Sequence, residues 1–185
     1  MKILVIDWNK IQSSVITLTY KILSDKYHPD MIVGIARGGW IVARLLSDLL
    51  SIKNLASLRI EFYKGIGKKA SKPIITQPIS EPPDGKSVLI VDDVVDSGES
   101  MSLAKQYITS MGAKEVKTAT IHMKPWSKIT PDYYVEIVDS WIIYPWEIRE
   151  SIEQLINMWK NESKESIKEK LISIGIPKEY IDLVI

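Results

Sequence analysis

The segment from Val88 to Gly98 leaves few folds open to this chain. Residues 88–91 are all aliphatic and follow the turn sequence at 82–85, which predicts a strand buried on both faces. Asp92 and Asp93 come directly after this run. Two more aliphatic residues then lead to Asp-Ser-Gly and to a segment with helical periodicity. A buried strand joined by a short turn to a helix is typical of an α/β sheet protein.

The same alternation of strand and helix recurs along the chain. Short aliphatic runs predict strands, and apolar positions at steps of three to four residues predict helices. Strands are expected at 31–35, 56–63, 87–91, 116–123, 133–137 and 141–144, and helices at 8–23, at 40–50 and after the 92–100 segment to about 111. This order predicts an α/β fold with a mainly parallel sheet flanked by helices. In such sheets ligands bind beyond the carboxyl ends of the strands.

Two segments fall outside this alternation. Residues 63–73 combine glycine and lysine without an apolar face, which predicts a mobile loop that closes over the site. From residue 147 onward the chain has a helical stripe, a candidate N-cap at Ser163 and a helix start at Pro177. We therefore expect a main domain over residues 1–149 and a small helical C-terminal appendage over residues 150–185.

Composition excludes several kinds of site and partner. The chain has no cysteine and only two histidines, which excludes disulfides, thiolate nucleophiles and Cys- or His-rich zinc sites. Its 24 basic and 23 acidic residues leave a formal charge of +1, so neither nucleic acid nor an anionic membrane is an expected partner. No stretch resembles a signal peptide or approaches the roughly 20 apolar residues of a membrane span. We expect a cytoplasmic protein.

The residues after the 88–91 strand suit a sugar phosphate. Backbone amides at the start of the following helix, together with the hydroxyls of Ser97 and Ser100, could hold a phosphate dianion. Asp92 and Asp93 could hold the vicinal hydroxyls of a ribose, directly or through Mg²⁺. Acids in this position can also simply cap the next helix, and Asp96 is a candidate for that role as well.

The complete string Val-Leu-Ile-Val-Asp-Asp-Val-Val-Asp-Ser-Gly-Glu-Ser, residues 88–100, closely resembles the signature with which type I phosphoribosyltransferases bind 5-phosphoribosyl-1-pyrophosphate (PRPP). It departs from that signature in having serine where threonine is common and Glu99 where a small residue is usual. Ala36-Arg37-Gly38-Gly39 is similar to the pyrophosphate loop of the family, which often contains a cis peptide bond at this turn. The resemblance assigns PRPP or pyrophosphate binding to Arg37, Gly38, Asp92, Asp93, Asp96, Ser97, Gly98, Glu99 and Ser100.

A further resemblance concerns the base. Lys124, followed by proline, and Trp141-Ile142 are similar to the base-binding segments of the xanthine-guanine branch of the family. An ammonium group can donate to a purine 6-oxo group but cannot accept from the amino group of adenine. Trp141 offers a stacking face, and the main chain of Ile142 can bond the base edge. Taken alone, tryptophans among apolar residues could equally belong to the core.

The resemblance implies the type I phosphoribosyltransferase fold and a Mg²⁺-dependent enzyme of purine salvage. Such an enzyme joins a 6-oxopurine to PRPP and releases pyrophosphate and a nucleoside 5′-monophosphate such as GMP or IMP. Asp96 is the implied general acid/base at purine N7, and Asp93 is the implied metal ligand. Arg37 would neutralise the leaving pyrophosphate. The family also implies a homo-oligomer, either a dimer or a tetramer.

Two alternatives stay open. One is a PRPP- or nucleotide-sensing regulator with the same fold, although the near-zero charge and the lack of a recognisable helix-turn-helix pattern argue against a nucleic-acid surface. The other is a phosphoribosyltransferase for adenine or a pyrimidine, against which Lys124 and Trp141 argue. The sequence leaves open which 6-oxopurine is preferred and which loop lysine contacts pyrophosphate.

Overall fold

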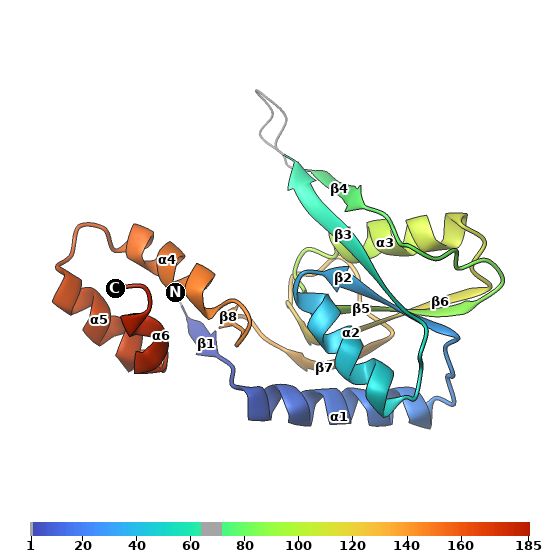
Figure 1. Cartoon of the computed structure of the whole chain (residues 1–185), viewed down its shortest axis with the longest axis horizontal. Helices are drawn as coiled ribbons and strands as arrows, with labels where there is room; N and C mark the ends of the chain where they lie inside the picture. Colours follow the sequence, from blue (N-terminus) through green and yellow to red (C-terminus); the bar gives the residue numbers. More distant parts are fainter. Residues whose placement is uncertain (1, 64–71) are drawn as a thin grey trace. The chain divides into compact units, whose positions relative to one another are not determined.

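The computed structural model describes residues 2–63 and 72–185 (Figure 1). These residues form two compact units. The sheet unit comprises Ser13–Val138, and the terminal unit joins the chain up to Gln12 with Asp139–Ile185. The boundary falls within helix α1 (Trp8–Ser24), whose predicted extent is confirmed. None of the helices in the described ranges is long and apolar enough to cross a membrane. The domain division expected at residue 149 stays a prediction.

A six-stranded sheet forms the centre of the sheet unit, in the order β4-β3-β2-β5-β6-β7. The strands are β2 (Met31–Ala36), β3 (Leu55–Tyr63), β4 (Lys72–Gln77), β5 (Ser87–Val95), β6 (Glu115–Met123) and β7 (Tyr133–Ile137), and helices α2 (Gly38–Leu49) and α3 (Glu99–Ser110) pack on them. Every pairing is parallel except that of β3 with β4. The predicted α/β fold with a mainly parallel sheet is therefore confirmed.

The edge strand β4 corrects one sequence prediction. Lys72 and Pro73 were expected to belong to a loop, but they begin β4 and pair antiparallel with the end of β3. Proline is tolerated there because an edge strand does not need every backbone donor. The rest of the predicted loop, residues 64–71, lies outside the described residues.

Helices α2 and α3 cover opposite faces of the sheet, as the alternation of side chains along β2 shows. Gly34 faces α2, where an added Cβ would lie 2.9 Å from the Cβ of Ala43. Its neighbours Val33 and Ile35 point the other way, into a core shared with buried residues of α3. A strand covered on both faces needs apolar residues at nearly every position, which explains the continuous aliphatic runs in the sequence.

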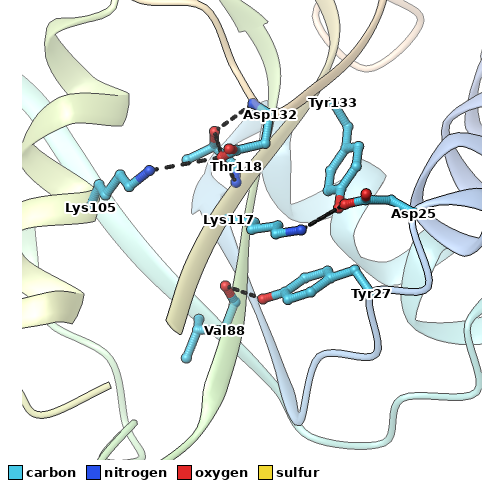
Figure 2. Close-up of polar contacts among 8 residues, drawn as sticks. All are labelled: Asp25, Tyr27, Val88, Lys105, Lys117, Thr118, Asp132 and Tyr133. Carbon is cyan, nitrogen blue, oxygen red and sulfur yellow. Dashed lines mark hydrogen bonds and ion pairs between the residues drawn. The ribbon is translucent and has the colours of Figure 1, made fainter. Parts of the chain in front are cut away.

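A polar cluster joins the end of α1 to β6 and β7 (Figure 2). The ammonium of Lys117 lies 2.6 Å from the carboxylate of Asp25 and 3.1 Å from the hydroxyl of Tyr133, which itself donates to Asp25. The hydroxyl of Tyr27 donates to the carbonyl of Val88 at 2.9 Å. The bonds from Lys117 and then Tyr133 lower the pKa of Asp25, whereas burial and the bond to Asp25 raise the pKa of Tyr133 to about 12.

The terminal unit pairs two short strands and adds three helices. Strand β1 (Ile3–Val5) runs parallel to β8 (Trp141–Ile143). The helices are α4 (Ile148–Met158), α5 (Lys164–Ser173) and α6 (Lys178–Asp182). The predicted helix starts are confirmed, because the Ser163 hydroxyl accepts from the Ser166 amide at 3.2 Å and Pro177 directly precedes α6. Aliphatic residues of all three helices share a core with β8.

Candidate active site

The turns that carry the predicted site residues lie at the carboxyl ends of three adjacent strands of the sheet unit. Arg37 follows β2, Asp96 follows β5 and Lys124 follows β6, and these three strands are adjacent and parallel. The backbone amide of Lys124 donates to the carbonyl of Val95 at 2.9 Å, so the ends of β5 and β6 are in direct contact. The Ala36–Arg37 peptide bond is cis, as the family resemblance implied.

The acid pair is held on a strand, not on a loop. β5 continues through Asp92 and Asp93, beyond the end predicted at Val91. Asp93 is only 8% exposed, and Gly38 lies so close that a Cβ there would be 1.9 Å from its carboxylate oxygen Oδ2. A Cβ on Gly39 would be 2.6 Å from the carbonyl oxygen of Val91. Glycine at both positions therefore allows the turn after β2 to approach the acid pair.

The carboxylates of Asp92 and Asp93 lie close enough to repel each other. The pKa of Asp92 is raised well above its usual value, first because burial disfavours the charged form and then because the charge of Asp93 lies beside it. Asp92 accepts from the Asp93 amide and Asp93 accepts from the Val94 amide, each at 3.0 Å. A divalent cation would relieve this repulsion. No group of three or more potential metal ligands exists among the residues that the structure describes, so a cation here would complete its coordination with substrate oxygens and water.

A cavity of about 210 Å³ opens where β5 turns into α3. It is lined by Phe62, Asp92, Val94, Val95, Asp96, Ser97, Gly98, Ser100 and Met101. Gly98 is the N-cap of α3 and has a φ of +86°, a conformation that favours glycine. The interpretation of Asp96 as the cap of this helix is therefore wrong. The sequence analysis missed Phe62, because nothing in the alternating pattern of β3 distinguishes a cavity wall from any exposed position.

Glu99, the acid at the position where the family signature usually has a small residue, has a partner. Its carboxylate lies 3.1 Å from the ammonium of Lys128, and the Lys128 amide donates to the carbonyl of Ser97 at 3.1 Å. Both charged side chains line a second hollow, of about 240 Å³, next to α3. The Lys128 side chain is 73% exposed, so this pair adds little stability, but it offsets the negative charge of Glu99.

Asp96 and Lys124 are linked by a residue that the sequence analysis missed. The indole Nε1 of Trp126 donates to Oδ1 of Asp96 at 2.6 Å. The ammonium of Lys124 lies 5.6 Å from the centre of the Trp126 ring, within cation–π range. Lys124 is 7% exposed, whereas Trp126 is 57% exposed. A tryptophan in a loop at the carboxyl end of a central strand was the signal available in the sequence.

Trp141 and Ile142, the other predicted base contacts, belong to the terminal unit. Ile142 is buried, and Trp141 is partly buried and packs against the core that the tail helices share with β8. Nearby, the rings of Tyr144 and Trp146 stack with centroids 4.8 Å apart. The base-binding roles of Trp141 and Ile142 stay predictions.

Comparisons with known proteins agree with this arrangement. The model of the phosphoribosyl transferase domain matches residues 5–152. The xanthine-guanine phosphoribosyltransferase of Cereibacter sphaeroides is 28% identical over 150 residues, a match covering 77% of this chain and 86% of that relative. The corresponding protein of Gluconobacter oxydans is 31% identical over 118 residues, covering 63% and 67%.

A solved structure extends the agreement to three dimensions. The crystal structure of a purine phosphoribosyltransferase from Pyrococcus horikoshii is similar with a TM-score of 0.71 and 39% sequence identity. The match covers 79% of this chain and 94% of that one. Since the family domain spans most of the sequence and the solved relative is matched over nearly its full length, this chain belongs to the phosphoribosyltransferase family.

Proposed function

We propose that this chain is a purine phosphoribosyltransferase that transfers the 5-phosphoribosyl group of PRPP to a 6-oxopurine. The observation that carries the proposal is that an acid pair, a serine- and glycine-containing helix start and a buried lysine meet at one sheet edge. Relatives named xanthine-guanine and purine phosphoribosyltransferases support it. The products are pyrophosphate and the nucleoside 5′-monophosphate of guanine, hypoxanthine or xanthine.

The cavity between β5 and α3 suits the ribose 5′-phosphate of PRPP. The hydroxyls of Ser97 and Ser100 and the amides at the start of α3 can donate to a phosphate dianion. Asp92 lines the same cavity and can accept from ribose hydroxyls. We assign Asp93 as the carboxylate that holds Mg²⁺, which when bound would neutralise charge on the pyrophosphate.

The reacting groups of the chain lie at the ends of three adjacent strands. As the bond from the anomeric carbon to pyrophosphate breaks and the bond to purine N9 forms, Arg37 offsets the charge of the leaving group. Asp96 takes the proton that N7 loses. Lys124 donates to the 6-oxo group, a bond that adenine cannot accept at that position. A base with an oxygen at this position, and not an amino group, therefore matches the donor-only ammonium of Lys124.

The remaining parts of the proposal rest on the family resemblance. Trp141 would stack on the base, and the main chain of Ile142 would bond its edge. A cytoplasmic location and assembly into a homo-dimer or homo-tetramer complete it. Analytical ultracentrifugation of the purified chain tests the assembly, and a sedimenting species of monomer mass at micromolar concentration would contradict it.

A panel of bases tests the function directly. The purified chain is incubated with PRPP and guanine, hypoxanthine, xanthine, adenine or uracil, with Mg²⁺ or with EDTA, and nucleotides are quantified by chromatography. We expect nucleoside monophosphates from 6-oxopurines alone, and none with EDTA. Product from adenine instead would overturn the assignment of the base. Tight PRPP binding in calorimetry without any product would favour the sensing regulator.

A further inference from the structure

Trp126 is the residue of the proposed base site for which the reaction above names no role. Its side chain is 57% exposed, yet the indole N–H makes a 2.6 Å bond to Asp96. This distance is slightly shorter than the usual length, about 2.7 to 2.9 Å, of charge-assisted bonds from nitrogen to a carboxylate. The partner is the carboxylate that we propose to accept the N7 proton, so the bond acts on the reacting group itself.

The backbone fixes the indole relative to Asp96. The amide of Lys124 bonds the carbonyl of Val95, and the amide of Lys128 bonds the carbonyl of Ser97, at 2.9 and 3.1 Å. The turn at residues 124–128 is therefore bonded to the residues on either side of Asp96, to Val95 at the end of β5 and to Ser97 beyond it. Trp126 lies in the middle of this turn, so the backbone places it next to Asp96 through bonds that do not involve the Asp96 side chain.

Asp96 needs such a partner because it is solvent-exposed in the turn between β5 and α3. A free carboxylate in that position rotates broadly about its last torsion. A bond to Oδ1 fixes the carboxylate plane and leaves Oδ2 available to a second donor. A purine whose N7 carries a proton is such a donor. The cation of Lys124, 5.6 Å from the ring centre, holds the indole from its face.

We propose that Trp126 is a positioning residue of the transfer reaction, whose indole N–H holds Oδ1 of Asp96 so that Oδ2 meets N7 of the purine. This inference rests on the proposed function and deepens it. It also gives Lys124 a second task, because the ammonium that bonds the 6-oxo group also supports the ring that orients Asp96. The two groups that recognise the purine are then coupled through one side chain.

Trp126→Phe tests the proposal, since phenylalanine keeps an aromatic face for Lys124 and deletes the N–H. We expect kcat for 6-oxopurines to fall roughly tenfold or more, the usual size for loss of a hydrogen bond to a charged group. The Kd of PRPP and the melting temperature should stay close to wild type. Trp126→His keeps a ring N–H donor and should retain more kcat than the phenylalanine variant. Equal losses for both would show that Trp126 only packs, and would overturn the proposal.

A matched control and a double variant separate positioning from packing. Trp159→Phe alters a tryptophan in the terminal unit that also contacts a lysine, with the Lys170 ammonium 5.3 Å from its ring centre, and should leave kcat unchanged. If Trp126 acts through Asp96, Trp126→Phe combined with Asp96→Asn should be no slower than Asp96→Asn alone. Losses that multiply would overturn the proposal. If the wild type is active and Trp126→Phe is equally active, the role of Trp126 is refuted and the proposed function stands. If the wild type itself makes no nucleotide, both the proposed function and the role of Trp126 are refuted.

Discussion

Gly38→Ala adds one methyl group at the contact between the turn after β2 and the acid pair of β5. The new Cβ would lie 1.9 Å from Oδ2 of Asp93 and 2.5 Å from its Cγ. The nearer contact must open from 1.9 Å to the 3.4 Å of an ordinary van der Waals contact, a displacement of about 1.5 Å. Asp93 is almost fully buried, so its carboxylate cannot escape the contact by simply turning further into solvent. The substitution therefore moves the group that we assign to Mg²⁺.

The size of the effect follows from this displacement. A misplacement of about 1 Å at reacting groups can lower a rate about 100-fold, so we expect kcat/KM for PRPP to fall by about that factor. Overpacking a filled site costs about 1 to 3 kcal/mol in unfolding free energy. For a chain of this length, each kcal/mol lowers the melting temperature by about 2 to 4 °C. The variant should stay folded at 25 °C and lose most of its activity.

Gly85→Ala is the matched control. Gly85 has a positive φ, of +67°, and no described residue lies within 4 Å of a Cβ placed there. Alanine in that conformation strains the backbone by about 1 to 2 kcal/mol without touching the site. Initial rates at varied PRPP and circular-dichroism melts should show that Gly85→Ala loses stability and keeps kcat/KM. A Gly38→Ala variant with wild-type kcat/KM would refute the reasoning, as would equal loss of activity in both variants.

Three further predictions follow from single groups. Asp96→Asn should lower kcat by about 10²- to 10⁴-fold with PRPP affinity and melting temperature near wild type, because an amide can bond N7 but cannot take its proton; an unchanged kcat would remove Asp96 from the reaction. Lys124→Ala should lower kcat/KM for 6-oxopurines roughly 10- to 100-fold in initial-rate assays and spare PRPP binding in calorimetry, and wild-type rates would place Lys124 outside the base site. The lowered pKa of Asp25 means that its stabilisation is complete above about pH 4 and is lost as the pH falls through its folded value. The wild type should therefore unfold at a higher urea concentration than Lys117→Met above about pH 4, and the difference between their unfolding midpoints should become smaller below about pH 4. A difference that does not change with pH would contradict this.

The order of strands and helices could be predicted because buried positions are occupied by apolar residues, whose spacing along the sequence differs between strands and helices. The runs at 31–35 and 88–91 are aliphatic throughout since helices cover both faces of β2 and β5. In α1 the buried positions recur at helical spacing, for example Ile11, Val15 and Leu18. Where a whole strand or one face of a helix is buried, the apolar residue types alone are enough to predict the element.

Two strand boundaries could not be predicted because pairing, not composition, determines them. β4 begins at Lys72 and Pro73, polar and conformationally restricted residues that an edge strand tolerates. β5 continues through its acid pair because the neighbouring strand β6 satisfies its backbone, with Asp92 opposite Thr120 in the parallel register. Charged residues normally predict the end of a buried strand, and only the partner strand reveals that this one continues.

The candidate site divides in the same way. The half that we propose to bind phosphate lies within one segment, residues 92–100, so the order of residues along the chain already places its carboxylates, hydroxyls and helix start. Phe62 and Lys128 come from other elements and reach this segment only through the fold. Glu99 departs from the family signature, and its partner, Lys128, could not be recognised from the sequence because it is 29 positions away.

The base-recognising half depends even more on contacts that no local pattern records. In the structure, the indole of Trp126 joins Lys124 to Asp96. The ammonium of Lys124 lies over the ring, and the indole N–H donates to the Asp96 carboxylate. Residues linked in this way do not act independently, and changes among them should be non-additive. Changing Lys124 to alter the choice of base would loosen the ring and, through it, Asp96. We therefore expect selectivity for the base and the rate of proton transfer to be coupled, so that a variant with a new base preference gains activity from a compensating change at Trp126.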